Sequence, residues 1–240
     1  MDPKHTADFT VRLQHIGPHG QARPSLFFDC FQDAASEQSA RLGISIHDLQ
    51  KRGLTWVVSR YHVQILRYPR WRERLRVTTW RVPQQNHTAP REFIVTDADH
   101  RTLCLARGVF VLLDRVTDRP VSPREHLPTY PVADERVWKG DSPTIPAFST
   151  ADFSTRITVR HVKNTRYIDF ALECVPRSIA HGVTLEFIDV NYSASARPGD
   201  TLLSLTQQMD GQGLSFIHHL VDDRCQLTYT GLITRWYAIR

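Results

Sequence analysis

The sequence predicts an α+β protein made of two similar units, each with one long helix and an antiparallel sheet. Three observations support this fold class. A segment of the first half resembles one of the second, each half carries an amphipathic stretch ahead of strand-like runs, and a proline-rich segment lies between them. With 240 residues, 41% apolar and 23% charged, the chain can bury one large core or two smaller ones.

The first long helix is predicted within residues 24–42. Its apolar side chains recur at helical spacing, and they are Leu26, Phe27, Cys30, Phe31, Ala34 and Ala35. Gly43 follows as a C-terminal cap. Asp33 and Glu37 lie one turn apart at the margin of this stripe, so we expect both on the solvated surface.

Antiparallel strands follow the helix. Residues 56–65 and 75–80 are strand-like, with a turn near Pro69 between them. Residues 93–113 contain an apolar run, a charged turn and a second apolar run, a pattern that predicts a β-hairpin.

The second half repeats this plan. A strand is expected over 156–160, and strands are predicted over 183–192 and 202–206, with a turn at Pro198-Gly199. A second helix is predicted ahead of the strands over 183–192 and 202–206, and Pro176 ends it. Its apolar stripe consists of Tyr167, Ile168, Ala171, Leu172 and Val175.

A second hairpin is predicted over 216–236. Laid over 93–113 without a gap, it matches Phe93 with Phe216, Asp99 with Asp222, and Gly108 with Gly231; this suggests a duplicated unit.

The segment between the halves, residues 117–149, contains six prolines and resists both helix and interior strand. We therefore predict a first domain over 1–116, a linker over 117–149 and a second domain over 150–240.

The charge pattern favours an acidic partner. The net charge is +5 and the pI is near 9.2, yet Arg and Lys are spread along the chain, so a nucleic-acid partner is not supported. No apolar run approaches the ~20 residues that span a bilayer, so no membrane partner is expected. Residues 1–5 are polar and lack the apolar core of a signal peptide, so we expect a cytoplasmic protein.

The cysteines and histidines show no metal-ligand spacing, so no metal or cofactor is predicted. Cys30, Cys104, Cys174 and Cys225 are scattered and are expected to be free thiols. Most of the twelve histidines, His218 and His219 among them, are expected on solvated faces. The loop at residues 15–20 holds two histidines, but its glycines and proline favour a tight turn over a metal site.

Several short motifs together resemble a known family. They are Gln32-Asp33-Ala34-Ala35, Leu42-Gly43, Gly53-Leu54-Thr55-Trp56-Val57-Val58-Ser59-Arg60, Arg67-Tyr68-Pro69-Arg70-Trp71, Thr78-Thr79-Trp80, His161-Val162-Lys163-Asn164 and Arg166-Tyr167-Ile168. This series is similar to that of the acyl-acyl carrier protein thioesterases, whose fold is a tandem pair of hotdog domains. The likeness covers most of the chain and is strongest over 24–114.

The resemblance implies an enzyme of fatty acid biosynthesis and lipid metabolism. It would hydrolyse the thioester that joins a fatty acyl chain to the phosphopantetheine arm of acyl carrier protein. That carrier is acidic, which suits the basic chain. Acyl-coenzyme A remains open as the donor, and the chain could be a monomer or a homodimer. The aromatic residues Phe27, Phe28, Phe31 and Trp56 could line an acyl tunnel, although core packing explains them equally well.

The resemblance places the catalytic site at His161, with Asn164 beside it at the start of the second helix. His161 would be the general base, and unpaired N–H groups at the helix opening would stabilise the oxyanion. The family has an aspartate and an asparagine four and two residues before this histidine and an acid on a later strand. Here those positions are Ile157, Val159 and Ser195.

Other readings of the same residues stay open. Asn164 could act only as a helix cap, and Cys174 lies too far along its helix to gain from the dipole, so we assign it to packing. A non-catalytic protein that binds acyl groups or acyl carrier is one alternative. A hotdog dehydratase is another, and it would need an acid such as Glu37 facing His161.

Overall fold

The computed structural model describes all residues except 1, 18–19, 85, 139–142, 148–149, 159–162, 177–178, 180–181, 210–213, 225–226 and 239–240. It contains two compact units. The N-terminal unit comprises Met1–Tyr61 and Leu66–Gly140, and the C-terminal unit comprises His62–Ile65 and Asp141–Arg240. Strand β2 (Leu54–Ile65) therefore contributes its first part to one unit and its last residues to the other.

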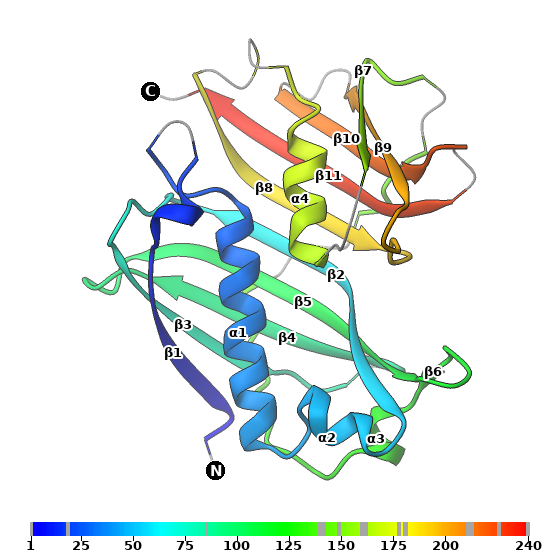
Figure 1. Ribbon diagram of the computed structural model, residues 1–240. Helices are drawn as coiled ribbons and strands as arrows, with labels where there is room; N and C mark the ends of the chain where they lie inside the picture. Colours follow the sequence, from blue (N-terminus) through cyan, green and yellow to red (C-terminus); the bar gives the residue numbers. More distant parts are fainter. Residues whose placement is uncertain are drawn as a thin grey trace. The chain divides into compact units, whose positions relative to one another are not determined.

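The N-terminal unit is an antiparallel sheet with one long helix across it (Figure 1). The strand order is β1-β3-β4-β5, followed by residues 54–61 of β2, with β6 on β5. The elements are β1 (Lys4–Thr10), η1 (Leu13–His15), α1 (Ser25–Arg41), α2 (Ile46–Gln50), β3 (Arg74–Arg81), β4 (Thr88–Thr96), β5 (Thr102–Asp114), β6 (Pro120–Val121) and α3 (Pro123–His126).

Helix α1 confirms the first predicted helix. It begins after Pro24 and ends before Leu42, and Gly43 takes the left-handed conformation, with φ of +67°, that a helix C-terminus favours. All six predicted apolar residues of the stripe are buried. Three polar residues, Ser25, Gln38 and Ser39, are buried on the same helix, so polar partners must meet them.

The C-terminal unit repeats the arrangement. The strand order is β7-β9-β10-β11-β8, followed by residues 62–65 of β2, and helix α4 packs on β9 and β10 (Figure 1). The elements are β7 (Phe153–Thr158), α4 (Asn164–Leu172), β8 (Val183–Tyr192), β9 (Thr201–Gln208), β10 (Leu214–Asp222) and β11 (Thr228–Ala238). Both units thus show the predicted hotdog plan of one helix on an antiparallel sheet.

The second helix is shorter than predicted. It ends at Leu172, and the predicted core residue Val175 lies in the turn that follows, where it is still buried. Proline disfavours helical geometry in the residue before it, so the helix ends ahead of Pro176 rather than at it.

Both predicted hairpins form, but the ungapped overlay of their turns is wrong. In the first hairpin the N–H of Asp97 donates to the carbonyl of Arg101, and in the second the N–H of Asp222 donates to that of Leu227. Asp222 therefore corresponds to Asp97 and not to Asp99. The second turn is one residue longer, which a gapless comparison cannot represent.

The proline-rich segment 117–149 is partly ordered against the N-terminal unit. Pro120 begins a short edge strand, and Pro123 is the first residue of α3, two positions where a missing N–H is tolerated. Val121 and Leu127 pack against a buried cluster of Leu49, Leu54 and Leu112. The expectation that this composition resists helix is wrong for α3, whereas β6 is an edge strand and not an interior one.

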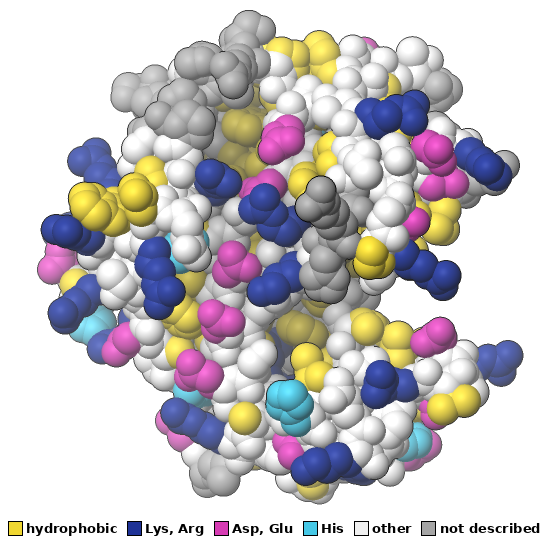
Figure 2. Space-filling view, viewed as in Figure 1, with side chains coloured by type: hydrophobic (Ala, Val, Ile, Leu, Met, Phe, Trp, Pro, Cys, Tyr) yellow, Lys and Arg dark blue, Asp and Glu magenta, His cyan; other side chains and the backbone are white. Residues whose placement is uncertain are grey.

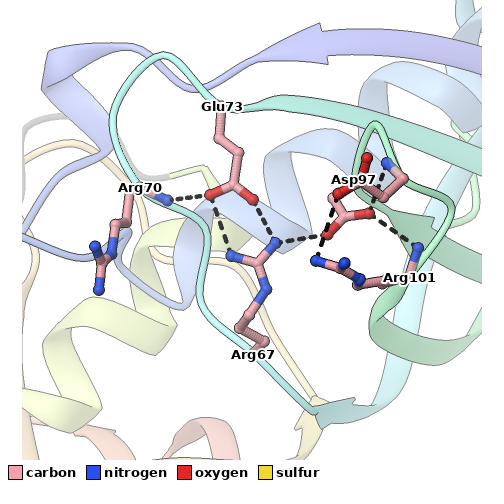
Figure 3. A network of polar contacts seen from close by, with 6 residues as sticks. Arg67, Arg70, Glu73, Asp97 and Arg101 are labelled. Atoms are coloured by element: carbon pink, nitrogen blue, oxygen red, sulfur yellow. Dashed lines mark hydrogen bonds and ion pairs between the residues drawn. The ribbon is translucent and has the colours of Figure 1, made fainter.

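A polar network fixes two turns of the N-terminal unit (Figure 3). The guanidinium of Arg67 donates to both carboxylate oxygens of Glu73 and, at 3.0 Å, to Asp97. The Asp97 carboxylate also accepts the backbone N–H groups of Asp99 and Arg101. These bonds hold the pKa values of Glu73 and Asp97 below their ordinary range.

Candidate functional site

The predicted base lies outside the described residues, together with its neighbours Val159 and Val162. The assignment of His161 therefore stays a prediction. Asn164 is described, and it is the first residue of α4, next to the N-cap Lys163. Its side-chain oxygen accepts the N–H of Thr165 at 3.0 Å, which is a local bond of the helix start.

The start of α4 offers fewer open donors than predicted. The N–H of Thr165 bonds the Asn164 side chain, and the N–H of Arg166 donates to the carbonyl of Lys163. One N–H is thus bonded by a side chain and the other by a backbone carbonyl, so neither is available to an oxyanion.

The substituted positions have no ionisable side chains. Ile157 is half-buried in β7, where it pairs with Leu202 of β9. Ser195 is exposed and lies in the loop after β8, not on a strand.

The loop that contains Ser195 is attached to α4. The hydroxyl of Tyr167, in the first half of α4, accepts the N–H of Ala196 at 2.8 Å. Asp200 ends the loop, and its carboxylate accepts the N–H of Arg197 and the hydroxyl of Tyr229. The structure thus brings the start of α4, the Ser195 loop and one carboxylate into the same region of the C-terminal unit. Sequence reasoning missed Asp200, because the turn residues around it explain it locally.

Glu37 is committed to another partner. Its carboxylate, on α1, lies 3.0 Å from the Nε2 atom of His5 on β1. The Glu37 side chain is about half exposed, as expected, whereas His5 is buried. The sequence did not reveal this pair, because the two residues meet only when β1 lies beside the helix.

The histidine loop is held by a turn, and the aromatic residues of α1 contact one another. Gly17 donates its N–H to the carbonyl of Gln21 and accepts the N–H of Gly20, which confirms the predicted tight turn. Phe28 and Phe31 are fully buried and pack edge-to-face with a centroid distance of 5.9 Å. These contacts are those of a packed core.

His218 is buried, and the expectation that it lies on a solvated face is wrong. It alternates with Phe216 and Leu220 on the core face of β10, and its two ring nitrogens bond the hydroxyls of Thr206 and Thr234 at 2.8 and 2.9 Å. Burial, with a smaller effect of the His219 charge, lowers the pKa of His218 to about 3. The ring is therefore neutral at physiological pH.

The C-terminal unit also contains a buried histidine–carboxylate contact that the sequence did not predict. The Nδ1 atom of His62 lies 2.5 Å from the carboxylate of Asp189, and both side chains are almost completely excluded from solvent. The two residues belong to strands far apart in sequence, so no local pattern connects them.

The cysteines are buried thiols where they are described. Cys30, Cys104 and Cys174 are free, and burial raises the pKa values of Cys30 and Cys104. Cys174 lies in the turn after α4 and donates to the carbonyl of Ser204, which agrees with its assignment to packing. Cys225 lies outside the described residues.

Within the described ranges, no group of three or more His, Cys, Asp or Glu side chains could hold a metal ion, and no helix is long and apolar enough to cross a membrane. Figure 2 shows Lys and Arg side chains dispersed over one face and interleaved with Asp and Glu, as their spacing in the sequence predicts.

Similarity to solved structures supports the fold. A 12:0-ACP thioesterase from Umbellularia californica aligns with a TM-score of 0.84 at 22% identity, covering all of this chain and 99% of its own. An acyl-ACP thioesterase from Bacteroides thetaiotaomicron aligns with a TM-score of 0.82 at 19% identity, with 98% of each chain covered. At these identities the likeness establishes the fold alone.

Sequence similarity identifies the family. A curated dodecanoyl-[acyl-carrier-protein] hydrolase of Cinnamomum camphora is 28% identical over 228 residues, which cover 85% of this chain but only 59% of that hydrolase. The family model of the acyl-ACP thioesterase N-terminal domain matches residues 2–127, and that of the C-terminal domain matches 152–238. Because these two models together cover most of its length, the chain belongs to the acyl-ACP thioesterase family.

Proposed function

We propose that this protein hydrolyses acyl thioesters of acyl carrier protein and releases a free fatty acid. The observation that carries the proposal is the match of both family domains, in order, to the two halves of the chain. The presence of the expected helix and sheet in each unit supports it. The pathway that this activity would serve is fatty acid biosynthesis.

The proposed reaction uses His161 as general base. The imidazole takes a proton from water as the water oxygen attacks the thioester carbonyl. The carbon–sulfur bond then breaks, and the sulfur leaves as the thiol of the carrier arm after it receives that proton. An unperturbed histidine titrates near pH 6.5, which suits both steps. Asp200 is the described carboxylate at the Ser195 loop, so it is our candidate for the acid that the family places on that side of the site.

The thioesterase is tested by free-thiol release from acyl-carrier and acyl-coenzyme A thioesters of several chain lengths. We expect release by the wild type, and loss of release in His161→Ala. His47→Ala is the matched control, because His47 is exposed on α2 and lies outside the proposed site. Release that persists in His161→Ala would reject the base, and no release from any thioester would reject the activity.

We propose that the acidic carrier docks on an arginine surface of the N-terminal unit. Arg70, Arg72 and Arg74 are exposed there, and Arg72 lies over the exposed ring of Trp71, with its guanidinium carbon 4.2 Å from the ring centroid. Attraction between opposite charges steers association, and salt weakens this attraction. Arg72→Glu should raise KM for the carrier thioester several-fold and leave KM for acyl-coenzyme A unchanged, whereas Arg119→Glu on the β5–β6 turn should change neither.

A non-catalytic acyl-binding protein is the second candidate. The observation that favours it is the absence of ionisable groups at Ile157 and Ser195. It predicts acyl-carrier binding without thiol release, and the same assay with a binding measurement separates the two functions. Cytoplasmic location and pairing into a homodimer remain predictions from the sequence.

A further inference from the structure

Two arginines of the N-terminal unit are buried directly opposite each other. Arg81, the last residue of β3, pairs with Arg91 of β4, and their side chains are 4% and 1% exposed. Both reach buried polar residues of α1. Like charges opposite each other on neighbouring strands repel, and a buried charge without a counter-charge is costly.

The protein supplies only neutral partners to these two cations. Arg81 donates from Nη2 to the Ser39 hydroxyl at 3.1 Å. Arg91 donates from Nη1 to the Gln38 side-chain oxygen at 2.5 Å and to the Thr79 hydroxyl at 3.2 Å. Within the described ranges, the structure records no ion pair between either arginine and a carboxylate.

Several donors of this cluster remain unused. The Nε and Nη1 atoms of Arg81, the Nη2 atom of Arg91 and the hydroxyl of Tyr61 are buried and have no hydrogen-bond partner among the described residues. Buried polar groups in folded proteins are nearly always bonded to protein or to ordered water, so four unused groups in one cluster call for a partner that these side chains do not provide.

The electrostatics of the cluster agree with this reading. Burial lowers the pKa of Arg91 well below its ordinary value, and the charge of Arg81 lowers it further. Burial also lowers the pKa of Arg81, against a smaller opposing effect of Tyr130. A guanidinium nevertheless keeps its proton in a protein, so the cluster carries two positive charges that an anion would stabilise.

Aromatic rings enclose the cluster. The Arg81 guanidinium lies 4.9 Å from the ring centroid of Trp56 and 5.0 Å from that of Tyr130. The ring of Tyr61 contacts the rings of Phe28 and Phe31 on α1. Charged donors therefore meet an apolar surface that suits the methylene groups of an organic acid.

We propose that Arg81, Arg91 and Tyr61 bind the carboxylate group of a small organic acid. Two guanidinium groups and one hydroxyl match the acceptor oxygens of a carboxylate, and the adjoining aromatic rings suit its hydrocarbon part. The carboxylate has two possible sources: a free short-chain acid, or the distal carboxylate of a dicarboxylic acyl thioester. The second source rests on the proposed thioesterase function.

Thermal unfolding of the full chain tests the site without reference to catalysis. Adipate, hexanoate, phosphate and chloride are titrated at equal ionic strength and neutral pH. We expect a saturable rise in Tm with adipate and hexanoate that exceeds the rise with phosphate, and none with chloride. No rise with either carboxylate, or an equal rise with phosphate, would overturn the proposal.

Variants locate the effect. Arg91→Met should abolish the rise in Tm with adipate, whereas Arg124→Met, an exposed arginine of α3, should retain it. If Arg91→Met does not fold, calorimetric titration of adipate into the wild type tests the proposal instead. Adipate binding to the wild type supports the site, and no adipate binding refutes it. Retention of the full adipate effect in a folded Arg91→Met would contradict the assignment.

Hydrolysis of two carrier thioesters then distinguishes the two sources of the carboxylate. Adipoyl and hexanoyl carrier thioesters have the same length, and only the first has a distal carboxylate. A dicarboxylic substrate predicts a kcat/KM ratio that favours adipoyl by on the order of tenfold, and loss of that preference in Arg91→Met. Adipate binding without such a preference identifies the free acid as the source. If neither thioester is hydrolysed, the proposed function fails, while the binding result stands.

Discussion

Two buried polar clusters, one in each unit, differ in how many of their hydrogen bonds the protein supplies. On β9 and β10 of the C-terminal unit, the cross-strand pair Thr206 and His218 is fully buried, and both histidine nitrogens are bonded. On β3 and β4 of the N-terminal unit, the cross-strand pair Arg81 and Arg91 is equally buried, yet three of its nitrogens are unbonded.

The difference teaches how to separate a structural polar group from a ligand-binding one. A buried group whose bonds are all supplied by the protein stabilises the fold, and it stays uncharged when burial shifts its pKa. A buried charged group that lacks partners costs free energy unless something else binds it. The C-terminal cluster thus belongs to the first kind, and the N-terminal cluster to the second.

The largest effect is expected from pH acting on His218. Its pKa is about 3 in the folded protein and near 6.5 in the unfolded chain, so below pH 6.5 the unfolded state binds the proton and the folded state does not. Stability should therefore fall as the pH drops from about 6.5 towards 3. Between about pH 6.5 and 4.5 the unfolding free energy should fall by about 2 kcal/mol, and it should fall further towards pH 3.

Urea unfolding of the wild type and His218→Gln at several pH values measures this contribution. The glutamine does not titrate, so the difference in slope between the two proteins isolates the histidine from all other groups. The carboxylates with lowered pKa values, such as Glu73, lose their stabilisation only below about pH 4.5. Equal slopes between pH 6.5 and 4.5 would show that His218 is not buried as a neutral ring.

Removal of one histidine partner should have the next largest effect. Thr206→Val keeps the shape of the side chain but leaves the Nδ1 atom of His218 unbonded, so the unfolding free energy should fall by about 2 kcal/mol. Thr206→Ser keeps the hydroxyl and should lose clearly less. Chemical denaturation at neutral pH compares the two, and equal losses would mean that packing rather than the hydrogen bond is responsible.

Removal of one arginine should cost little. Arg81→Met deletes a buried charge that the protein does not neutralise, so relief of the repulsion with Arg91 should offset the lost bond to Ser39. Without added organic acid, we expect the unfolding free energy to change by no more than about 1 kcal/mol. A loss as large as that of Thr206→Val would show that the two clusters are alike, and the comparison would fail.

The smallest difference is expected between the two hairpin turns. The Asp97 carboxylate accepts two backbone N–H groups and binds Arg67, whereas the recorded backbone bond of the Asp222 carboxylate is to the N–H of Leu227. Asp97→Ala should therefore lower Tm by a few degrees more than Asp222→Ala does. Asp97→Asn should likewise lower Tm more than Asp222→Asn does, with smaller shifts than the alanine variants. A larger loss of Tm in the Asp222 variants would contradict the role given to the Arg67 network.

Local patterns predicted much of the fold. Apolar periodicity and Gly43 predicted α1, and the charged turns predicted both hairpins. The turn alignment failed because the register of a strand pair depends on loop length and bulges, which residue matching ignores. The end of α4 was placed too late because the apolar stripe continues into the turn, where Val175 is buried without being helical.

The polar interior could not be predicted in the same way. His218 follows Ile217 and precedes another histidine, so its burial emerges only once β10 lies between β9 and β11. Arg81 ends β3 and Arg91 lies in the first half of β4, and nothing in the local sequence around either arginine indicates burial. Their proximity depends on the β3–β4 register, and the missing counter-charge depends on the entire neighbourhood. His161 and Asn164 were inferred from family resemblance, and the role of each stays a prediction.

The central claim is that the Arg81–Arg91 cluster of the N-terminal unit receives an organic acid, while the protein itself supplies both hydrogen bonds of the His218 ring in the C-terminal unit. Diffraction from crystals grown with adipate, compared with crystals grown with chloride at equal ionic strength, tests it most directly. We predict adipate density within hydrogen-bond distance of Arg81 and Arg91, and no change around His218. Unchanged density at the arginines, with adipate present at a concentration that saturates binding in solution, would contradict the claim.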